Sequence, residues 1–351
     1  MFRRKGYELL FHQLLMRIFA KYENERTISA AFHILQGKRS GTTMQDVGLY
    51  KLFPYFGILR KLSRTQFDSY VQQLVMDRYI EIDDNGYFTL TTMGRTFNEK
   101  PFPYYFDGWH YRGNEHVFFG RLSLIIQALS HQAAGNKAFV PIERDESIQA
   151  FTRHYLVHHD FQRKSLQQNL REQLLSCFEA SELTDEQLNI VTQRLHGVDV
   201  YGFTWSQIAE RCERDVLSCQ LLFISALHTL LKQLEEHSYE LLNSLAYGLK
   251  ITNVLTDSAQ QTANLLLQGR SLDEIAHIRR LKMSTIEDHI VEFAMYEPAF
   301  TIDAFISREE CQQVYDAIDS YMTKKLKVLK EALPNLSYFQ LKLALAKEGI
   351  V

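Results

Sequence analysis

Proline and glycine are scarce in this sequence, with 6 and 16 residues among 351. Long stretches instead carry apolar residues at spacings of three and four, which is the period of an amphipathic helix. The composition, 46% hydrophobic and 23% charged, is that of a globular protein with buried cores and excludes a disordered chain. We therefore predict a mainly α protein in which strands are a minority.

Cysteine is scarce as well. The sequence has four scattered cysteines, Cys177, Cys212, Cys219 and Cys311. Because none of them forms a C-x-x-C pair, we expect reduced thiols and no structural zinc site. His154 and His158 have the i, i+4 spacing of a metal-binding helix, with surface or partly buried histidines as the alternative. We predict that the protein holds no metal and no cofactor.

Long apolar runs are also missing. No stretch of eighteen apolar residues occurs, which argues against a membrane span. The apolar N-terminal segment is interrupted by Glu8, His12 and Arg17, and no small-residue cleavage site follows it, so it does not fit an export signal. These features predict a cytoplasmic, nucleoid-associated protein with no membrane partner.

The motifs of common enzyme classes are absent too. The sequence has no G-x-x-x-x-G-K-S/T loop, whose backbone N–H groups would cradle nucleotide phosphates. The segment Gly37-Lys38-Arg39-Ser40 lacks the required glycine and a preceding strand. There is no G-x-S-x-G elbow and no cysteine ligand set. We therefore expect a protein that is not an enzyme and has no catalytic residues.

Charge is distributed unevenly along the chain. The net charge of −3 lacks the basic excess that is typical of nucleic-acid-binding domains. Residues 1–70 nevertheless carry 12 Lys and Arg against 5 Asp and Glu, a balance of +7, so the remainder carries −10. A phosphate-binding surface is thus predicted in the N-terminal region. Elsewhere a protein partner is the easier interpretation.

Residues 1–100 have the pattern of a winged helix. A helix over "TISAAFHILQ" should stop at Gly37. Ser63 and Gln66 fit a capping box that opens a helix of about Arg64 to Asp77. The apolar residues of that helix fall on one face: Phe67, Val71, Leu74 and Val75. Two alternating segments then flank Asp83-Asp84-Asn85-Gly86, and Asn-Gly between such segments predicts a β-hairpin.

This module resembles the RQC domain of RecQ helicases over about seventy residues, in "HILQGKRS" (33–40), "YKLFPYFGI" (50–58) and "LTTMG" (90–94). That domain contacts duplex DNA near a fork through its helix N-terminus and its wing. A helix N-terminus with nearby cations forms an anion site. The resemblance therefore implies phosphate contacts at Arg60, Lys61, Ser63 and Arg64, and secondarily at Lys38 and Arg39. Solvated surface charges are the alternative, and Asp83 and Asp84 at the wing tip would repel phosphate.

Residues 101–255 are predicted to be a helical middle region. Eight aromatic residues from Phe102 to Phe119 could stack on single-stranded bases or pin an irregular segment to a core. Helices are expected near 121–134 and 145–179. The segment "LTDEQLNIVTQRLHG" and a capping box at Thr204 and Gln207 together resemble a sigma-factor-like helix-turn-helix. A helical packing unit without DNA contact is the alternative.

Residues 256–351 carry the clearest pattern, "TANLLLQGRSLDEIAHIRRLKMSTIEDHIVEFAMYE". Capping boxes at Ser271/Glu274 and Ser284/Glu287 predict a helix-turn-helix, with a core of Ile275, Ala276, Leu281, Ile286 and Ile290. The segment and its tail, "SYFQLKLALAKEG", resemble the domain appended to many RecQ-type helicases. In a major groove the base edges would face Ser284, Thr285 and Asp288, and the DNA backbone would face Arg279, Arg280 and Lys282. A protein-docking face is the alternative.

Taken whole, the chain resembles the YpbB family of Firmicute bacteria, whose genes typically lie beside a RecQ-type helicase gene. The resemblance implies a non-enzymatic DNA-binding accessory protein that acts with a RecQ-type DNA helicase in DNA repair or recombination, on forked or duplex DNA. Two alternatives stay open. One is a helix-turn-helix transcription regulator, and the other is a protein-docking adapter with no DNA contact.

Overall fold

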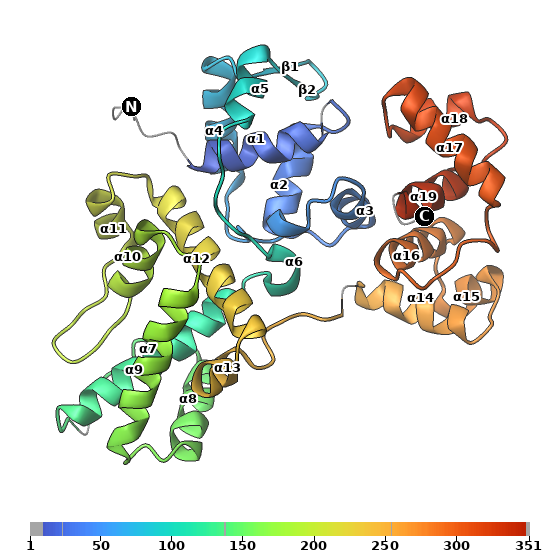
Figure 1. Ribbon diagram of the computed structural model, residues 1–351. Coiled ribbons are helices and arrows are strands. Elements are labelled where there is room, and N and C mark those ends of the chain that lie inside the picture. The colour runs from blue at the N-terminus through green and yellow to red at the C-terminus, as the bar shows by residue number, and fades with distance from the viewer. Residues whose placement is uncertain (1–9, 23, 137, 254, 349–351) are drawn as a thin grey trace. The chain divides into compact units, whose positions relative to one another are not determined.

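The computed structural model describes residues 10–22, 24–136, 138–253 and 255–348 (Figure 1). Within them the chain forms nineteen α-helices, one short 3₁₀ helix and one two-stranded sheet. The prediction of a mainly α protein with a small hairpin is therefore confirmed.

The described residues divide into two compact units. The first unit contains residues 10–15, 58–60 and 99–252, and the second contains 16–57, 61–98 and 253–348. The second unit thus combines parts of two segments predicted as separate domains, 1–100 and 256–351. The threefold division predicted from the sequence stays a prediction.

The N-terminal part of the second unit is a small helical module with one hairpin. Its elements are α1 (Leu10–Tyr22, whose first half belongs to the first unit), α2 (Ile28–Gln36), α3 (Gly41–Leu49), η1 (Phe53–Tyr55), α4 (Arg64–Met76), β1 (Ile80–Ile82), β2 (Phe88–Leu90) and α5 (Thr92–Asn98). Aromatic pairs fill its core. The ring centroids of Phe19 and Phe88 are 4.4 Å apart, and those of Phe32 and Phe67 are 5.2 Å apart. Such pairs stabilise a core beyond the area that they bury.

Local signals set the ends of these elements as predicted. Gly37 ends α2 in the left-handed conformation, with φ of 70°, and a Cβ there would lie 2.8 Å from the Cα of Gly57. The hairpin is antiparallel, with Ile80 opposite Leu90 and Ile82 opposite Phe88. Asp83 holds the turn, because its carboxylate accepts hydrogen bonds from two backbone N–H groups of the hairpin. Of the four predicted core positions of α4, three are buried, whereas Val75 is 39% exposed.

One aspartate of this module, Asp46, is buried. Asp46 is 3% exposed and accepts a hydrogen bond of 2.8 Å from Nε of Arg26. Burial raises the pKa of the Asp46 carboxyl from its ordinary 3.8 to about 6, and Arg26 only partly opposes this effect. Ionised Asp46 therefore costs stability above about pH 6, and this cost disappears as the pH falls toward the unfolded value.

An Asp46→Asn variant should reveal this cost. Asparagine can still accept the hydrogen bond of Arg26 but does not titrate. Between pH 7 and pH 4 the free energy of unfolding of the parent should rise relative to that of the variant, by about 1.4 kcal/mol for each unit of the pKa difference. Urea unfolding of both proteins across this range measures the change. Parallel pH profiles would contradict the prediction.

The C-terminal part of the second unit is a bundle of six helices. They are α14 (Asp257–Leu267), α15 (Leu272–Arg279), α16 (Met283–Tyr296), α17 (Arg308–Tyr321), α18 (Leu326–Ala332) and α19 (Tyr338–Lys347). Its core is aliphatic. Ile275, Ile286 and Ile290 are fully buried, and Ala276 and Leu281 pack against them while partly buried. All five were predicted as core positions.

One predicted capping box in this bundle is present and the other is wrong. The Ser271 hydroxyl accepts from the Glu274 N–H while the Glu274 carboxylate accepts from the Ser271 N–H, so α15 begins as predicted. Helix α16 begins two residues earlier than predicted, with Lys282 instead of Ser284 as its N-cap. Ser284 then lies inside the first turn and cannot act as the cap.

The first unit is a bundle around one long helix (Figure 1). Its helices are α6 (Gly108–Tyr111), α7 (Asn114–Ala133), α8 (Glu146–His158), α9 (Lys164–Ala180), α10 (Asp185–Gln193), α11 (Trp205–Arg211), α12 (Val216–Glu236) and α13 (Glu240–Ala246). Helix α12 contacts α7, α9, α10, α11 and α13. It is long and apolar enough to cross a membrane, but 83% of its most apolar window is buried inside the protein, as in a core helix.

Two boundaries in this unit differ from the prediction. The helix expected over 145–179 is two helices, because the chain turns between His158 and Lys164, with Asp160 at φ of 53°. The predicted capping box of Thr204 and Gln207 is present, but the helix that it opens ends at Arg211. Asp215 then caps the separate helix α12.

Candidate nucleic-acid interface

The predicted phosphate contacts of the N-terminal module lie around the start of α4. The Ser63 hydroxyl accepts a hydrogen bond of 3.1 Å from the Gln66 N–H, so it caps the helix as predicted. Lys61, just before it, is exposed. Arg64 is half exposed, donates to Asp68 and Ser29, and lies over the Phe32 ring. Its cation is thus held in place at the surface.

Lys38 is brought to the same place by the packing of α2. The Gln36 side chain donates a hydrogen bond of 2.9 Å to the Leu62 carbonyl, which joins the end of α2 to the segment before α4. Burial lowers the pKa of the nearby His33, and the charges of Lys38 and Arg64 lower it further. Two segments more than twenty residues apart in sequence therefore present their cations around one histidine. We call Lys38, Lys61, Ser63 and Arg64 the α4 patch.

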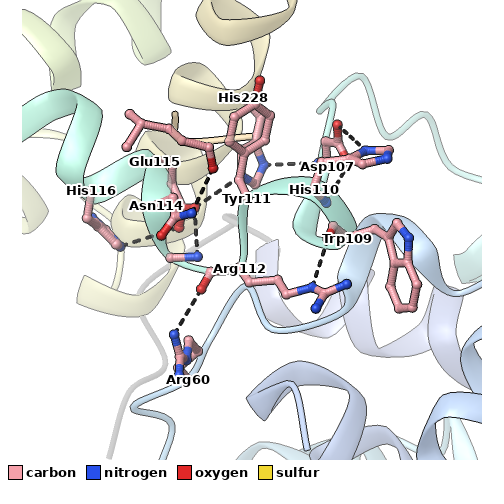
Figure 2. Close-up of polar contacts among 12 residues, drawn as sticks. Arg60, Asp107, Trp109, His110, Tyr111, Arg112, Asn114, Glu115, His116 and His228 are labelled. Carbon is pink, nitrogen blue, oxygen red and sulfur yellow. Dashed lines mark hydrogen bonds and ion pairs between the residues drawn. The ribbon is translucent and has the colours of Figure 1, made fainter. Parts of the chain in front are cut away.

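Two further candidates of this module have structural partners. Arg39 is exposed, and its Nη2 donates a hydrogen bond of 2.7 Å to the Leu255 carbonyl. Arg60 belongs to the first unit, where its Nη1 donates 3.1 Å to the Arg112 carbonyl (Figure 2). Arg60 thus belongs to a different unit from the α4 patch. Whether either arginine contacts DNA stays a prediction.

The candidates of the C-terminal bundle are divided between its surface and its interior. Arg280, in the left-handed conformation after α15, is exposed, as are Lys282 and Ser284, while Thr285 is partly buried. Arg279 is directed inward: its guanidinium donates to Ser258, Gln261 and Thr262 of α14. Arg279 therefore fastens α15 to α14, and its hydrogen-bonding groups are largely occupied within the domain.

Asp288, the third residue predicted to face base edges, also has protein partners. Asp288 Oδ1 accepts a hydrogen bond of 2.7 Å from Nζ of Lys342 on α19 and one of 3.2 Å from Nε2 of Gln45 on α3. An aspartate in a DNA-reading position needs a donor on a base, and here both donors come from the protein. This contact disfavours base reading through the middle of α16.

The aromatic segment of the middle region forms part of a core. Phe106, Trp109 and Tyr111 are buried, and the last two belong to α6. This arrangement matches the predicted alternative in which the aromatics pin an irregular segment to a core.

Beside this segment lies a buried polar network that sequence reasoning missed (Figure 2). His228 Nδ1 accepts a hydrogen bond of 3.0 Å from the Asp107 N–H, and His228 Nε2 lies 3.5 Å from Glu115 Oε2. Because Nδ1 is an acceptor, the proton of the neutral ring is on Nε2 and faces the carboxylate. Burial alone would raise the pKa of Glu115, but the contacts with His228 and His116 outweigh it and the pKa is lowered.

No sequence signal marks this pair, because Glu115 and His228 are more than a hundred residues apart and lie on different helices. The contacts of His228 with Asp107 and Glu115 hold the segment from Asp107 to Glu115 against α12. We assign it a structural role.

The histidines with metal-like spacing do not gather further ligands. The rings of His154 and His158 lie 6.3 Å apart on α8. Throughout the part of the chain that the structure describes, no group of three or more His, Cys, Asp or Glu side chains is arranged to hold a metal.

Comparison with known proteins shows the class of the C-terminal domain. Residues 258–345, which contain almost all of α14 to α19, match a protein family described as a helix-turn-helix domain. The chain is also 30% identical over 347 residues to Protein YpbB of Bacillus subtilis (strain 168), a match that covers 96% of this chain and 97% of that protein. The chain therefore belongs to the YpbB family. No solved structure matches it significantly.

Proposed function

We propose that the protein binds forked or duplex DNA through the α4 patch and serves a RecQ-type helicase as a non-enzymatic accessory in DNA repair or recombination. The observation that carries the proposal is the convergence of Lys38, Lys61 and Arg64 around the capped start of α4. Cations at a helix N-terminus favour phosphate, because the free N–H groups and the helix dipole act in the same direction. The helix-turn-helix family match supports DNA binding independently.

The helicase partnership rests on the likeness of the two terminal modules to parts of RecQ-type helicases. Separate modules of this kind would supply to a motor protein, from another chain, the DNA contacts that fused helicases carry themselves. A transcription regulator that reads sequence through α16 is less well supported, since Asp288 already has two protein partners.

The test is fluorescence anisotropy with forked, duplex and single-stranded DNA across a salt series. A Lys38→Ala/Lys61→Ala/Arg64→Gln variant should bind more weakly. The slope of log affinity against log salt should be shallower by about 2 to 3, since each lost phosphate contact contributes about 0.9. The control removes three exposed arginines of the first unit, Arg144, Arg153 and Arg171, and so changes the net charge equally.

Two further readouts sharpen this test. Bound phosphate near His33 should raise the pKa of that ring, which an NMR titration with and without DNA measures. A RecQ-type helicase on forked DNA should unwind faster with the parent or the control protein and not with the patch variant. Equal salt slopes for patch and control variants would refute the α4 patch as the DNA site, and no binding at low salt would refute the proposal as a whole.

A further inference from the structure

Helix α16 of the helix-turn-helix domain carries a stripe that another helix of the same unit covers. At about 100° per residue, positions 288 and 295 lie within roughly 20° of each other around the helix. Asp288 on this stripe is one of the residues predicted to face base edges, whereas Ser284, one turn earlier, is exposed. Met295 continues the stripe toward the end of α16. The same stripe is the one that α3 contacts.

Helix α3 is shaped for this contact by two glycines, seven residues apart. Gly41 lies against Asp288, so that an ideal Cβ at position 41 would be 4.0 Å from the Asp288 Cβ. Gly48 lies against Met295, and a Cβ at position 48 would be 1.9 Å from its sulfur. The spacing of the two glycines equals the spacing of the two residues that they face. At Gly48 the missing side chain lets the two helices approach this closely, whereas at Gly41 a Cβ would be in ordinary van der Waals contact.

Polar contacts fix the register of the two helices. Gln45, between the two glycines, donates to Asp288, and the Tyr296 hydroxyl donates to the Met44 carbonyl. Edge-to-face packing of Phe53 and Tyr296, with ring centroids 6.1 Å apart, extends the contact beyond α3. These interactions fix how α3 is aligned along the stripe of α16.

We propose that α3 is an internal cap on α16, and that the helix-turn-helix domain contacts DNA through this stripe only after α3 has moved away. With α3 in place, a major groove cannot lie along the Asp288 and Met295 side of α16, because the backbone of α3 lies against both residues. DNA affinity at α16 is then reduced by the fraction of molecules that are uncapped. This inference rests on the proposed function, since it concerns a second DNA contact of the same protein.

A reversible cross-link tests the cap. The 4.0 Å separation lies within the range of disulfide Cβ pairs, so a Gly41→Cys/Asp288→Cys variant should form a disulfide under mild oxidation. The K38A/K61A/R64Q changes are included to remove the α4 patch. With duplex DNA at low salt, the reduced protein should bind at least about ten-fold more tightly than the oxidised one. Gly41→Cys alone, treated identically, controls for oxidation of native thiols.

Each outcome decides a different point. Failure of the disulfide to form, by thiol counting, would show that α3 does not lie on α16 in solution. Equal affinity of the oxidised and reduced forms would overturn the cap while leaving DNA binding by the parent protein intact. If the parent itself binds no DNA, the proposed function fails, and disulfide formation then identifies the contact as permanent packing. A Gly48→Leu variant, which crowds Met295, should bind DNA several-fold more tightly if the cap exists, and an unchanged affinity would oppose it.

Discussion

Replacing Glu115 with alanine should lower the free energy of unfolding of the first unit by about 3–5 kcal/mol. The side chain is 1% exposed, and its Oε2 accepts a hydrogen bond of 2.9 Å from the Gly113 N–H as well as facing His228. Alanine would leave both of these donors in a buried site without their acceptor. Losing one partner of a buried polar pair costs far more than the pair contributes, because the remaining group stays desolvated.

Two variants bracket this prediction. Glu115→Gln keeps an acceptor in the same place and should cost less than alanine. Glu179→Ala removes an exposed carboxylate from α9 and should change stability by no more than about 0.5 kcal/mol. Urea unfolding followed by circular dichroism measures all three. If Glu115→Ala is as mild as Glu179→Ala, the network does not hold the first unit together.

A single added methyl group at Gly94 should destabilise the winged-helix module by about 3 kcal/mol or more. An ideal Cβ there would lie 2.0 Å from the Tyr79 carbonyl oxygen and 3.0 Å from the terminal methyl of Met16. The carbonyl is backbone and is fixed by a hydrogen bond of 3.1 Å from the Thr91 N–H. The clash can therefore be relieved only by moving α5 away from the loop before β1.

Gly86→Ala is the matched control. Gly86 has φ of 79°, so alanine there is strained, but beyond its own chain neighbours no described atom would lie within 4 Å of the new methyl. Its cost should stay near 1–2 kcal/mol, the ordinary cost of the left-handed conformation. The melting temperatures of Gly94→Ala and Gly86→Ala compare a clash with backbone strain alone. A Gly94→Ala protein as stable as Gly86→Ala would mean that α5 is free to shift.

Features set by neighbouring residues could be predicted from the sequence. The capping residues Ser63, Thr204 and Ser271 each start a helix where expected, and the Asn85-Gly86 turn joins two antiparallel strands as expected. The prediction at Ser284 was wrong because the Ser-x-x-Glu pattern also occurs where the serine is already inside the helix, here as the second residue of α16. A capping box depends on backbone geometry that the sequence pattern alone does not specify.

Features set by distant residues could not be predicted. A basic residue at the end of a helix suggests a surface cation, yet Arg279 turns toward α14 because four acceptor atoms on three residues there meet its guanidinium. The glycine spacing in "GTTMQDVG" gains its meaning only from Asp288 and Met295, more than two hundred residues away. His33 begins the RQC-like segment 33–40, but its nearness to the Arg64 charge depends on the fold. In each case the partner is distant in sequence and is brought near only by the fold.

The division of the second unit between both ends of the sequence has a consequence for protein synthesis. The first unit ends at residue 252, whereas α19 of the second unit ends at Lys347. At about 5–20 residues per second, the ribosome needs roughly 5–20 seconds to add the segment between them. During that interval the glycine-lined side of α3 has been made and its partner has not. A nascent chain stalled there would present this side to chaperones or to the completed bundle of another molecule.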